Sequence, residues 1–221
     1  YMWTAPEYFT KEEVHEINEL AKSIPLDEGR TGSRHHDPDA IEQTEFYGTN
    51  EIRQSQVKWF TPPQYRMPDY LVDKINQATQ KAMDECGWPW LLNHSENYQY
   101  TIYNHNPDLP TGDFYTWHTD AGAEPYPNGQ IRKLSASIQL SDPNDYEGGH
   151  FQWIETTRAF DNLKFQSQII HSDDLVQTAP FSGKELGSLL VFPSWLHHQV
   201  TPVTRGVRQS LVIWNTGWPL K

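Results

Sequence analysis

Two histidines and one carboxylate have the types and spacing to bind a metal ion. His118 and Asp120 stand two positions apart beside an aromatic-rich stretch, and His198 follows 198 − 118 = 80 residues later. Because residues i and i+2 of an extended strand project from the same face, His118 and Asp120 are expected to reach one ion together. Two imidazoles and a carboxylate on one side of an ion such as Fe(II) form a facial triad, which leaves the other coordination positions open.

Other histidines compete for this role. His171-Ser172-Asp173 repeats the His-x-Asp spacing, but it follows a polar stretch and precedes an acidic turn, so the sequence favours His118 and Asp120. His35-His36-x-x-Asp39 lies in a polar segment without a strand pattern and is interpreted as a solvated loop. His150 lacks a carboxylate partner and is interpreted as structural.

An arginine follows ten residues after His198. In an extended strand Arg208 and Ser210 share one face, and the other face carries apolar residues that are expected to pack, namely Val207, Leu211 and Ile213. A guanidinium binds a carboxylate through two parallel hydrogen bonds, and a serine hydroxyl can add a third. The stretch 133–141 alternates in the same way, and Gln139 on its polar face is a further candidate for contact with a bound acid.

The combined motifs resemble those of the Fe(II)/2-oxoglutarate dioxygenases, most of all their prolyl 4-hydroxylase branch. They are His118-x-Asp120, Gly148-Gly149-His150-Phe151, His198-Gln199-Val200-Thr201-Pro202-Val203 and Arg208-x-Ser210. The resemblance covers residues 95–217, about half of the chain. His-x-Asp alone is a weak signal, whereas all four motifs in this order are specific. Since the third motif starts at His198, the adjacent His197 is expected to point away from the ion.

The resemblance implies a reaction and its participants. His118, Asp120 and His198 would hold Fe(II), and Arg208 would hold the distal carboxylate of 2-oxoglutarate. Tyr103 resembles the tyrosine beside the 2-oxoglutarate pocket, and the expected contacts of this cosubstrate also include Ser210 and Gln139. O2 is the other cosubstrate, and ascorbate is an optional further cofactor. The products would be succinate, CO2 and a hydroxylated substrate.

The expected substrate is a prolyl residue in a peptide or protein. Prolines stack well on aromatic rings, and Trp117, Trp153 and Trp214 are candidates to line the site. A free amino acid or another peptidyl residue is the alternative substrate. The alternative of another class is a non-catalytic metal-binding β-barrel module, because the same three ligands can hold Zn²⁺. Arg208 favours the enzyme, since a pure metal-binding module needs no cation near its ligands.

The composition narrows the partners and the location. The formal charge of −12 makes nucleic acid an unfavourable partner, because phosphate backbones are bound by basic surfaces. Cys86 is the only cysteine, so no internal disulfide can form, which fits a reducing, cytoplasmic location. No apolar run reaches membrane-spanning length, and no membrane partner is expected. At 221 residues the chain is expected to form one domain.

The elements that must position these residues are expected to be mainly strands. The predicted fold is a double-stranded β-helix, the cupin-like jelly-roll, formed by a catalytic core at residues 95–217. Residues 1–94 are expected to supply a helical buttress and a mobile loop. The loop, residues 26–56, would cover a substrate through Arg30, Arg34 and Tyr47, and Ile52 to Phe60 would pair as a strand.

Two N-terminal helices are expected. The first spans residues 10–24, where Thr10 caps the helix and Glu13 completes a capping box. The second spans residues 68–86 and ends at Gly87. Both carry an apolar stripe, so both are expected to pack on one face of the sheet.

Overall fold

Two antiparallel sheets face each other in the computed structural model, which describes residues 2–29, 52–108, 112–154 and 176–219. The larger sheet has nine strands in the order β1-β12-β8-β14-β6-β4-β2, with β5 and β9 also paired to β14. The smaller sheet has five strands in the order β11-β10-β13-β7-β3. This arrangement is the predicted jelly-roll.

The larger sheet is built from strands of both halves of the chain. Its strands are β1 (Trp3–Ala5), β2 (Asp27–Glu28), β4 (Gln56–Phe60), β5 (His94–Ser95), β6 (Tyr98–Asn104), β8 (Ile131–Gln139), β9 (Tyr146–Gly148), β12 (Leu189–Pro193) and β14 (Val203–Gly217). The smaller sheet contains β3 (Arg53–Gln54), β7 (Phe114–His118), β10 (Phe151–Ile154), β11 (Val176–Thr178) and β13 (His198–Val200). The strand expected between Ile52 and Phe60 therefore exists as β3 and β4, one in each sheet.

Helices α1 (Lys11–Lys22) and α3 (Asp69–Cys86) form where the sequence predicts them, and α5 (Phe181–Lys184) is a short turn of helix. Thr10 accepts a hydrogen bond from the Glu13 backbone N–H, and the Glu13 carboxylate accepts one from the Thr10 N–H, so the capping box is present. Gly87 ends α3 with a φ of +66°, a left-handed conformation that glycine adopts without strain.

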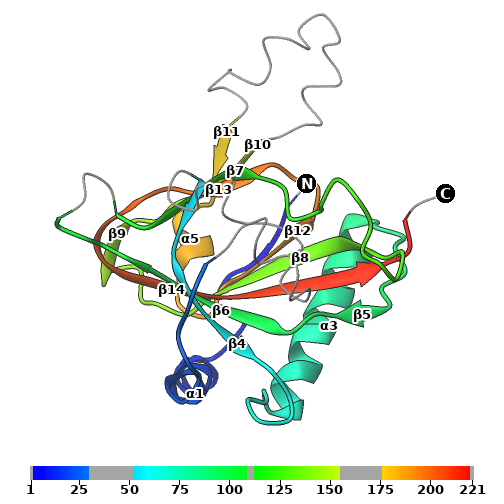
Figure 1. Cartoon of the computed structure of the whole chain (residues 1–221), viewed down its shortest axis with the longest axis horizontal. Helices are drawn as coiled ribbons and strands as arrows, with labels where there is room; N and C mark the ends of the chain where they lie inside the picture. The colour runs from blue at the N-terminus through cyan, green and yellow to red at the C-terminus, as the bar shows by residue number, and fades with distance from the viewer. Residues whose placement is uncertain (1, 30–51, 109–111, 155–175, 220–221) are drawn as a thin grey trace, which may run out of the picture.

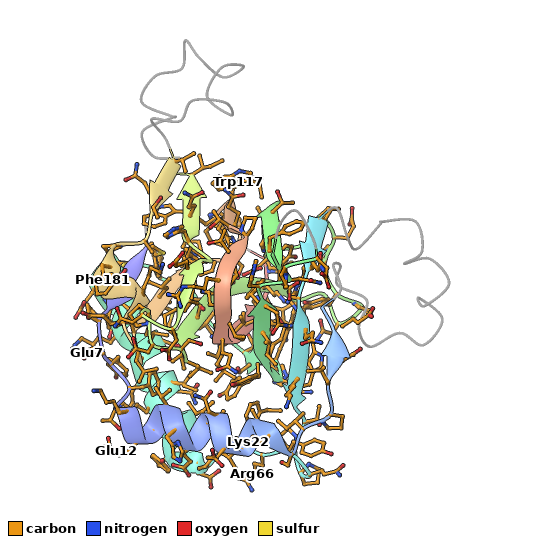
Figure 2. The ribbon with its side chains drawn as sticks, turned by 90° about the vertical axis from the view of Figure 1, so that its left-hand side faces the viewer. Glu7, Glu12, Lys22, Arg66, Trp117 and Phe181 are labelled. Atoms are coloured by element: carbon orange, nitrogen blue, oxygen red, sulfur yellow. The ribbon has the colours of Figure 1, made fainter. Side chains whose placement is uncertain are left out.

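The molecule has three layers, with α1 and α3 on the outer side of the larger sheet (Figure 1). The buried stripes of both helices pack on the outward residues of the central strands, among them Leu134, Leu189, Leu211 and Ile213. A second apolar cluster fills the space between the sheets and includes Phe151, Leu190 and Phe192. Figure 2 shows α1, between Glu12 and Lys22, on the far side of the molecule from Trp117.

Some expectations differ from the structure or lie outside the described residues. Val207 is 39% exposed in an open pocket beside α1, so the expectation that it packs is wrong. The proposed lid residues Arg30, Arg34 and Tyr47, and both rival motifs, His35-His36-x-x-Asp39 and His171-Ser172-Asp173, lie outside the described residues. Among the described residues, no helix combines the length and apolarity needed to cross a bilayer.

Candidate active site

The pairing of β7 with β13 brings the two distant histidines together. His118 ends β7, His198 begins β13, and the two residues are direct partners in the antiparallel register. Asp120 lies in a bend after β7, so the expected extended strand through Asp120 ends two residues early. The bend is held by the Ala121 N–H, which donates to the Ser194 carbonyl at 2.8 Å. Asp120 thus reaches the histidines by a turn of the backbone.

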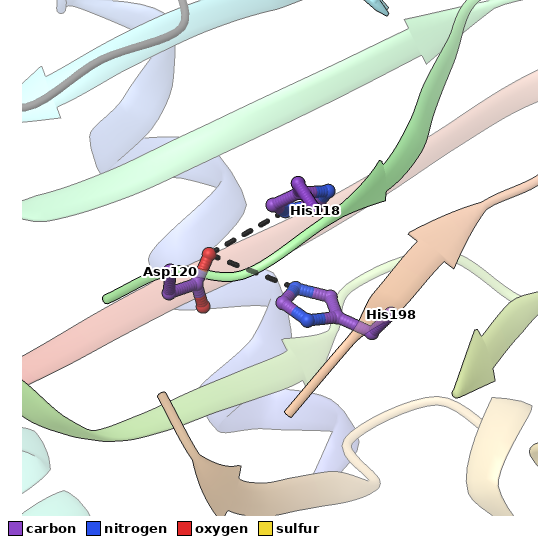
Figure 3. Close-up of side chains that lie close together, drawn as sticks. All are labelled: His118, Asp120 and His198. Atoms are coloured by element: carbon purple, nitrogen blue, oxygen red, sulfur yellow. Dashed lines mark ion pairs between the residues drawn. The ribbon is translucent and has the colours of Figure 1, made fainter. Parts of the chain in front are cut away.

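The three side chains converge on one point (Figure 3). The Asp120 Oδ1 lies 3.5 Å from His118 Nε2 and 3.6 Å from His198 Nε2. One ligand atom from each residue lies within 4.8 Å of the other two. Ligands about 2.1 Å from a single ion must lie within about 4.2 Å of one another. The spacing to Asp120 therefore fits one shared ion, and the donor set is the facial triad of non-haem Fe(II) sites.

The protonation states of two of these residues suit metal binding. Burial lowers the pKa of His198 to about 4, against the opposing effect of the nearby Asp120 carboxylate, so this imidazole is neutral at pH 7. Burial alone would raise the pKa of Asp120, but His198 and His118 outweigh it and hold the pKa far below its usual value. A metal binds the deprotonated forms of these groups, and the protein presents them in that form.

Each imidazole is oriented by a backbone carbonyl two residues before it and by aromatic neighbours. His118 Nδ1 lies 2.7 Å from the Thr116 carbonyl, and His198 Nδ1 lies 2.8 Å from the Leu196 carbonyl. If each Nδ1 carries the proton, as a carbonyl partner requires, Nε2 is left free as the ligand atom. Phe151 and Phe192 pack on His198 at ring-centroid distances of 5.3 and 4.8 Å.

The register of β14 gathers the candidate cosubstrate residues. Arg208 pairs with Tyr103 on β6, while Ser210 pairs with Gln139 on β8 and with Thr101 on β6. Arg208 Nη2 donates to Gln139 Oε1 at 2.9 Å, and its guanidinium carbon lies 5.5 Å from the centre of the Tyr103 ring. Long-range strand pairing thus places all four predicted residues beside one another.

Arg208 is 2% exposed, and among the described residues no carboxylate lies within ion-pair distance of it. Its partner Gln139 is a neutral amide. Arg132, another arginine near the metal ligands, is different, because Glu96 accepts from it at 2.7 and 2.8 Å. A buried guanidinium without an anionic partner is unfavourable, so Arg208 is suited to receive an anion.

One cavity joins most of the predicted residues. Tyr103, Arg208, Ser210 and the three metal-ligand candidates line it together. Gln139 lies behind Arg208 and does not line this cavity. His197 is exposed, as expected, and His150 is not part of the metal-ligand cluster.

Two arginines beside this cavity carry no signal in the sequence: Arg53, which is buried, and Arg132, which is partly buried. Arg53 lines the cavity from β3, and Arg132 lies over the Trp214 ring at 3.9 Å. Neither belongs to a recognisable motif, and no local pattern distinguishes a buried arginine from a surface one. Tyr115, on β7, stacks on His118 with ring centroids 3.4 Å apart.

Sequence comparisons agree with this site. A family model described as the 2OG-Fe(II) oxygenase superfamily matches residues 98–216, more than half of the chain. A PKHD-type hydroxylase of Teredinibacter turnerae is 33% identical over 105 residues, which cover 47% of this chain and 38% of the relative. The chain therefore spans less than two fifths of the length of this curated relative.

Solved structures share the fold. A Pseudomonas putida prolyl-4-hydroxylase aligns with a TM-score of 0.58 at 20% identity, covering 97% of this chain and 91% of that chain. A second neighbour is a Trichoplax adhaerens prolyl hydroxylase in complex with a peptide fragment of the hypoxia inducible factor oxygen degradation domain. It aligns with a TM-score of 0.58 at 14% identity, and the alignment covers 97% of this chain and 82% of that chain. Since the family model covers more than half of the chain and the architecture agrees with it, the protein belongs to the 2OG-Fe(II) oxygenase superfamily and has the fold of its prolyl hydroxylases.

Proposed function

We propose that the protein is an Fe(II)- and 2-oxoglutarate-dependent dioxygenase that hydroxylates a prolyl residue in a peptide or protein. The balanced reaction converts 2-oxoglutarate, O2 and the substrate C–H into succinate, CO2 and the hydroxylated product. Iron bound here would supply the activation of O2 and of the C–H bond. His118, Asp120 and His198 would hold it as two neutral imidazoles and one carboxylate.

The observation that carries this proposal is the buried Arg208 in the same cavity as the three ligands. A module that only binds a metal does not need a buried guanidinium beside its ligands. A dicarboxylate that reaches the metal with one end would bring its other carboxylate to Arg208, and the guanidinium binds such a group through two hydrogen bonds. Gln139 fixes the guanidinium by accepting from Nη2, and the Tyr103 ring forms an adjacent wall.

The prolyl assignment is supported by the relatives and by the aromatic wall of the cavity. Phe151, Phe192 and Trp214 line it, which gives an apolar ring surface on which a pyrrolidine can pack. The indole N–H of Trp214 is buried and has no hydrogen-bond partner among the described residues.

The test is a turnover assay with a defined substrate library. Protein loaded with Fe(II) is incubated with 2-oxoglutarate and proline-containing peptides; succinate is measured by chromatography and peptides gaining one oxygen are identified by mass spectrometry. We expect succinate release together with a hydroxylated proline. Oxygen gained on free proline or on another residue would replace the prolyl assignment, and the absence of succinate with every substrate would overturn the enzymatic proposal.

Asp120→Ala is expected to abolish this turnover, because it removes the carboxylate ligand and leaves two imidazoles to hold the ion. The loss should exceed 100-fold, since metal sites depend on their full ligand set and even outer partners contribute about 10- to 100-fold. The matched control is Glu147→Ala, which removes an exposed carboxylate paired with Arg205. Equal succinate yield from Asp120→Ala and the unmodified protein would exclude Asp120 as a ligand.

A further inference from the structure

We propose that Arg53, acting through the ring of Tyr115, is a positioning residue for the metal ligand His118. This inference rests on the proposed metal site but not on the proposed substrate. Arg53 lies on β3, outside residues 98–216 that the family model matches. The metal site would therefore depend on a strand that the family's matched region does not include.

The two histidine ligands are supported differently. His198 packs against Phe151 and Phe192, whose rings also contact each other and belong to the apolar cluster between the sheets. Among the described residues, His118 has one close ring contact besides His198, the Tyr115 ring, which stacks on it at 3.4 Å with an interplanar angle of 11°. The hydrogen bond from Nδ1 to Thr116 restrains one edge of the imidazole, and the stack with Tyr115 restrains its plane.

A shift in the strand register makes this stack possible. Tyr115 and His118 are three positions apart, so a regular strand would place them on opposite faces. The pairing of β7 with β13 is irregular, because Tyr115 is opposite Val200 while His118 is opposite His198. Two steps along β13 thus correspond to three steps along β7, and this irregularity brings Tyr115 onto the same face as His118.

Arg53 covers the other face of Tyr115. Its guanidinium carbon lies 4.7 Å from the ring centre, and since His118 occupies one face at 3.4 Å, the guanidinium must occupy the opposite one. The strand register brings the two residues together, because Arg53 is the direct partner of Tyr115 in the β3–β7 pair. The result is a three-layer stack of guanidinium, phenol and imidazole.

The guanidinium is itself held in place. Arg53 Nε donates to Ser55 Oγ at 2.8 Å, and Nη2 donates to Gln99 Oε1 at 2.9 Å. Gln99 Oε1 also accepts from the Thr101 hydroxyl at 3.0 Å, which fixes the amide. Gly29 closes the outer side, where an added Cβ would come within 2.1 Å of Ser55 Oγ and 2.8 Å of Arg53 Nε.

The physical consequence is a restrained imidazole plane. An imidazole that is contacted on one face only can rotate about its Cβ–Cγ bond, so that Nε2 no longer points at the ion. With Tyr115 fixed between His118 and the planar, anchored guanidinium, this rotation requires the whole stack to move. Side chains that orient metal ligands typically change metal affinity by about 10- to 100-fold, and the same order is expected here.

The test measures binding of Co(II) alone, by titration calorimetry and by the visible absorption spectrum of the bound ion. Arg53→Met is expected to weaken Co(II) binding about tenfold and to broaden the spectrum. Arg53→Lys should behave in the same way, because an ammonium keeps the charge but not the planar stack. Tyr115→Leu should weaken binding, and Tyr115→Phe should preserve it within about twofold. Arg205→Met, which removes an exposed arginine, is the control.

A double-mutant cycle separates this role from a general loss of stability. If Arg53 acts through Tyr115, Arg53→Met should have little further effect on Co(II) affinity in a Tyr115→Leu background. Unchanged Co(II) affinity in Arg53→Lys and Tyr115→Leu would overturn the inference, even if the melting temperature falls. If the unmodified protein binds Co(II) but its iron form makes no succinate, the proposed function fails and this inference is still tested by the same titrations.

Discussion

At the residue scale, the site depends on buried charged side chains, two of which a bound ligand would neutralise. Asp120 is flanked by two imidazoles, Arg132 is paired with Glu96, and Arg208 has a neutral amide partner. Isolated charges are disfavoured in such surroundings. The cavity is therefore suited to bind two charged groups, a cation beside Asp120 and an anion beside Arg208.

Arg208→Ala is expected to raise the KM for 2-oxoglutarate by about 30-fold or more, because losing one partner of a buried charge pair costs about 2 kcal/mol or more. The kcat at saturating 2-oxoglutarate should change much less. Arg208→Lys should give an intermediate KM, since it keeps the charge without the two-pronged geometry. Steady-state assays of succinate release measure both constants.

An unchanged KM in Arg208→Ala would mean that the distal carboxylate binds elsewhere. Arg205→Met is the control for removing positive charge at the surface, and it should leave both constants as they are.

At the element scale, α1 is joined to the rest of the protein through its first turn. Glu13 completes the capping box with Thr10 and also accepts from Lys74 of α3 at 2.7 Å. Burial would raise the pKa of Glu13, but Lys74 and the Thr10 N–H outweigh it and lower the pKa below the usual value of 4.5. The ionised carboxylate therefore stabilises the folded state.

The sign of the pH dependence follows from this lowered pKa. The stabilisation is complete above pH 4.5 and is lost as pH falls through the lower pKa of the folded state. Glu13→Gln should therefore reduce the free energy of unfolding at pH 7, and the difference from the unmodified protein should shrink at pH 3. Urea unfolding followed by circular dichroism at both pH values measures it.

Two variants bracket this result. Thr10→Ala removes the other half of the capping box and should lower stability by about 1 kcal/mol at pH 7. Glu12→Gln changes an exposed carboxylate in the same turn and is the control. A Glu13→Gln difference that stays constant from pH 7 to pH 3 would contradict the role of its ionised form.

At the scale of the whole molecule, β14 connects the helices, the larger sheet and the cavity. It pairs with β5, β6, β8 and β9, and its two faces have different tasks. Leu211 and Ile213 pack in the cluster under the helices, while Arg208 and Ser210 line the cavity. The position of the site is therefore linked to the integrity of the core.

Leu211→Ala is expected to destabilise the protein by about 3 kcal/mol, because the side chain is fully buried and its removal leaves a cavity. Val207→Ala, on the same strand but 39% exposed, should cost less than about 1 kcal/mol. Thermal and urea unfolding give both values. Similar losses for the two variants would mean that the helix layer contributes little to stability.

Several expectations for the whole molecule stay predictions. They include the single domain with its catalytic core at 95–217, the cytoplasmic location, the use of ascorbate and the substrate-covering role of the loop expected at residues 26–56. The described ends of that segment contain strands β2 and β3, and residues 30–51 lie outside the described residues. The single-domain expectation is tested by equilibrium unfolding followed with two spectroscopic probes, since one domain should unfold in one cooperative transition.

The sequence by itself determined the features that depend on local spacing. Capping residues and an apolar stripe were enough to predict α1 and α3, strand alternation separated Leu211 from Arg208, and the motifs named His118, Asp120 and His198. Each of these follows from backbone geometry within a few residues. The resemblance then supplied the fold of the core.

Only the tertiary structure decided which distant residues meet. The β3–β7 pair brings Arg53 to Tyr115, the irregular β7–β13 register places Tyr115 on His118, and a bend rather than a strand directs Asp120 to the histidines. Local spacing fixes which face of a strand a side chain occupies, but strand pairing over long separations fixes what lies across from it. No pattern within β3 indicates its partner strand, so the contact of Arg53 with Tyr115 could be found only in the folded chain.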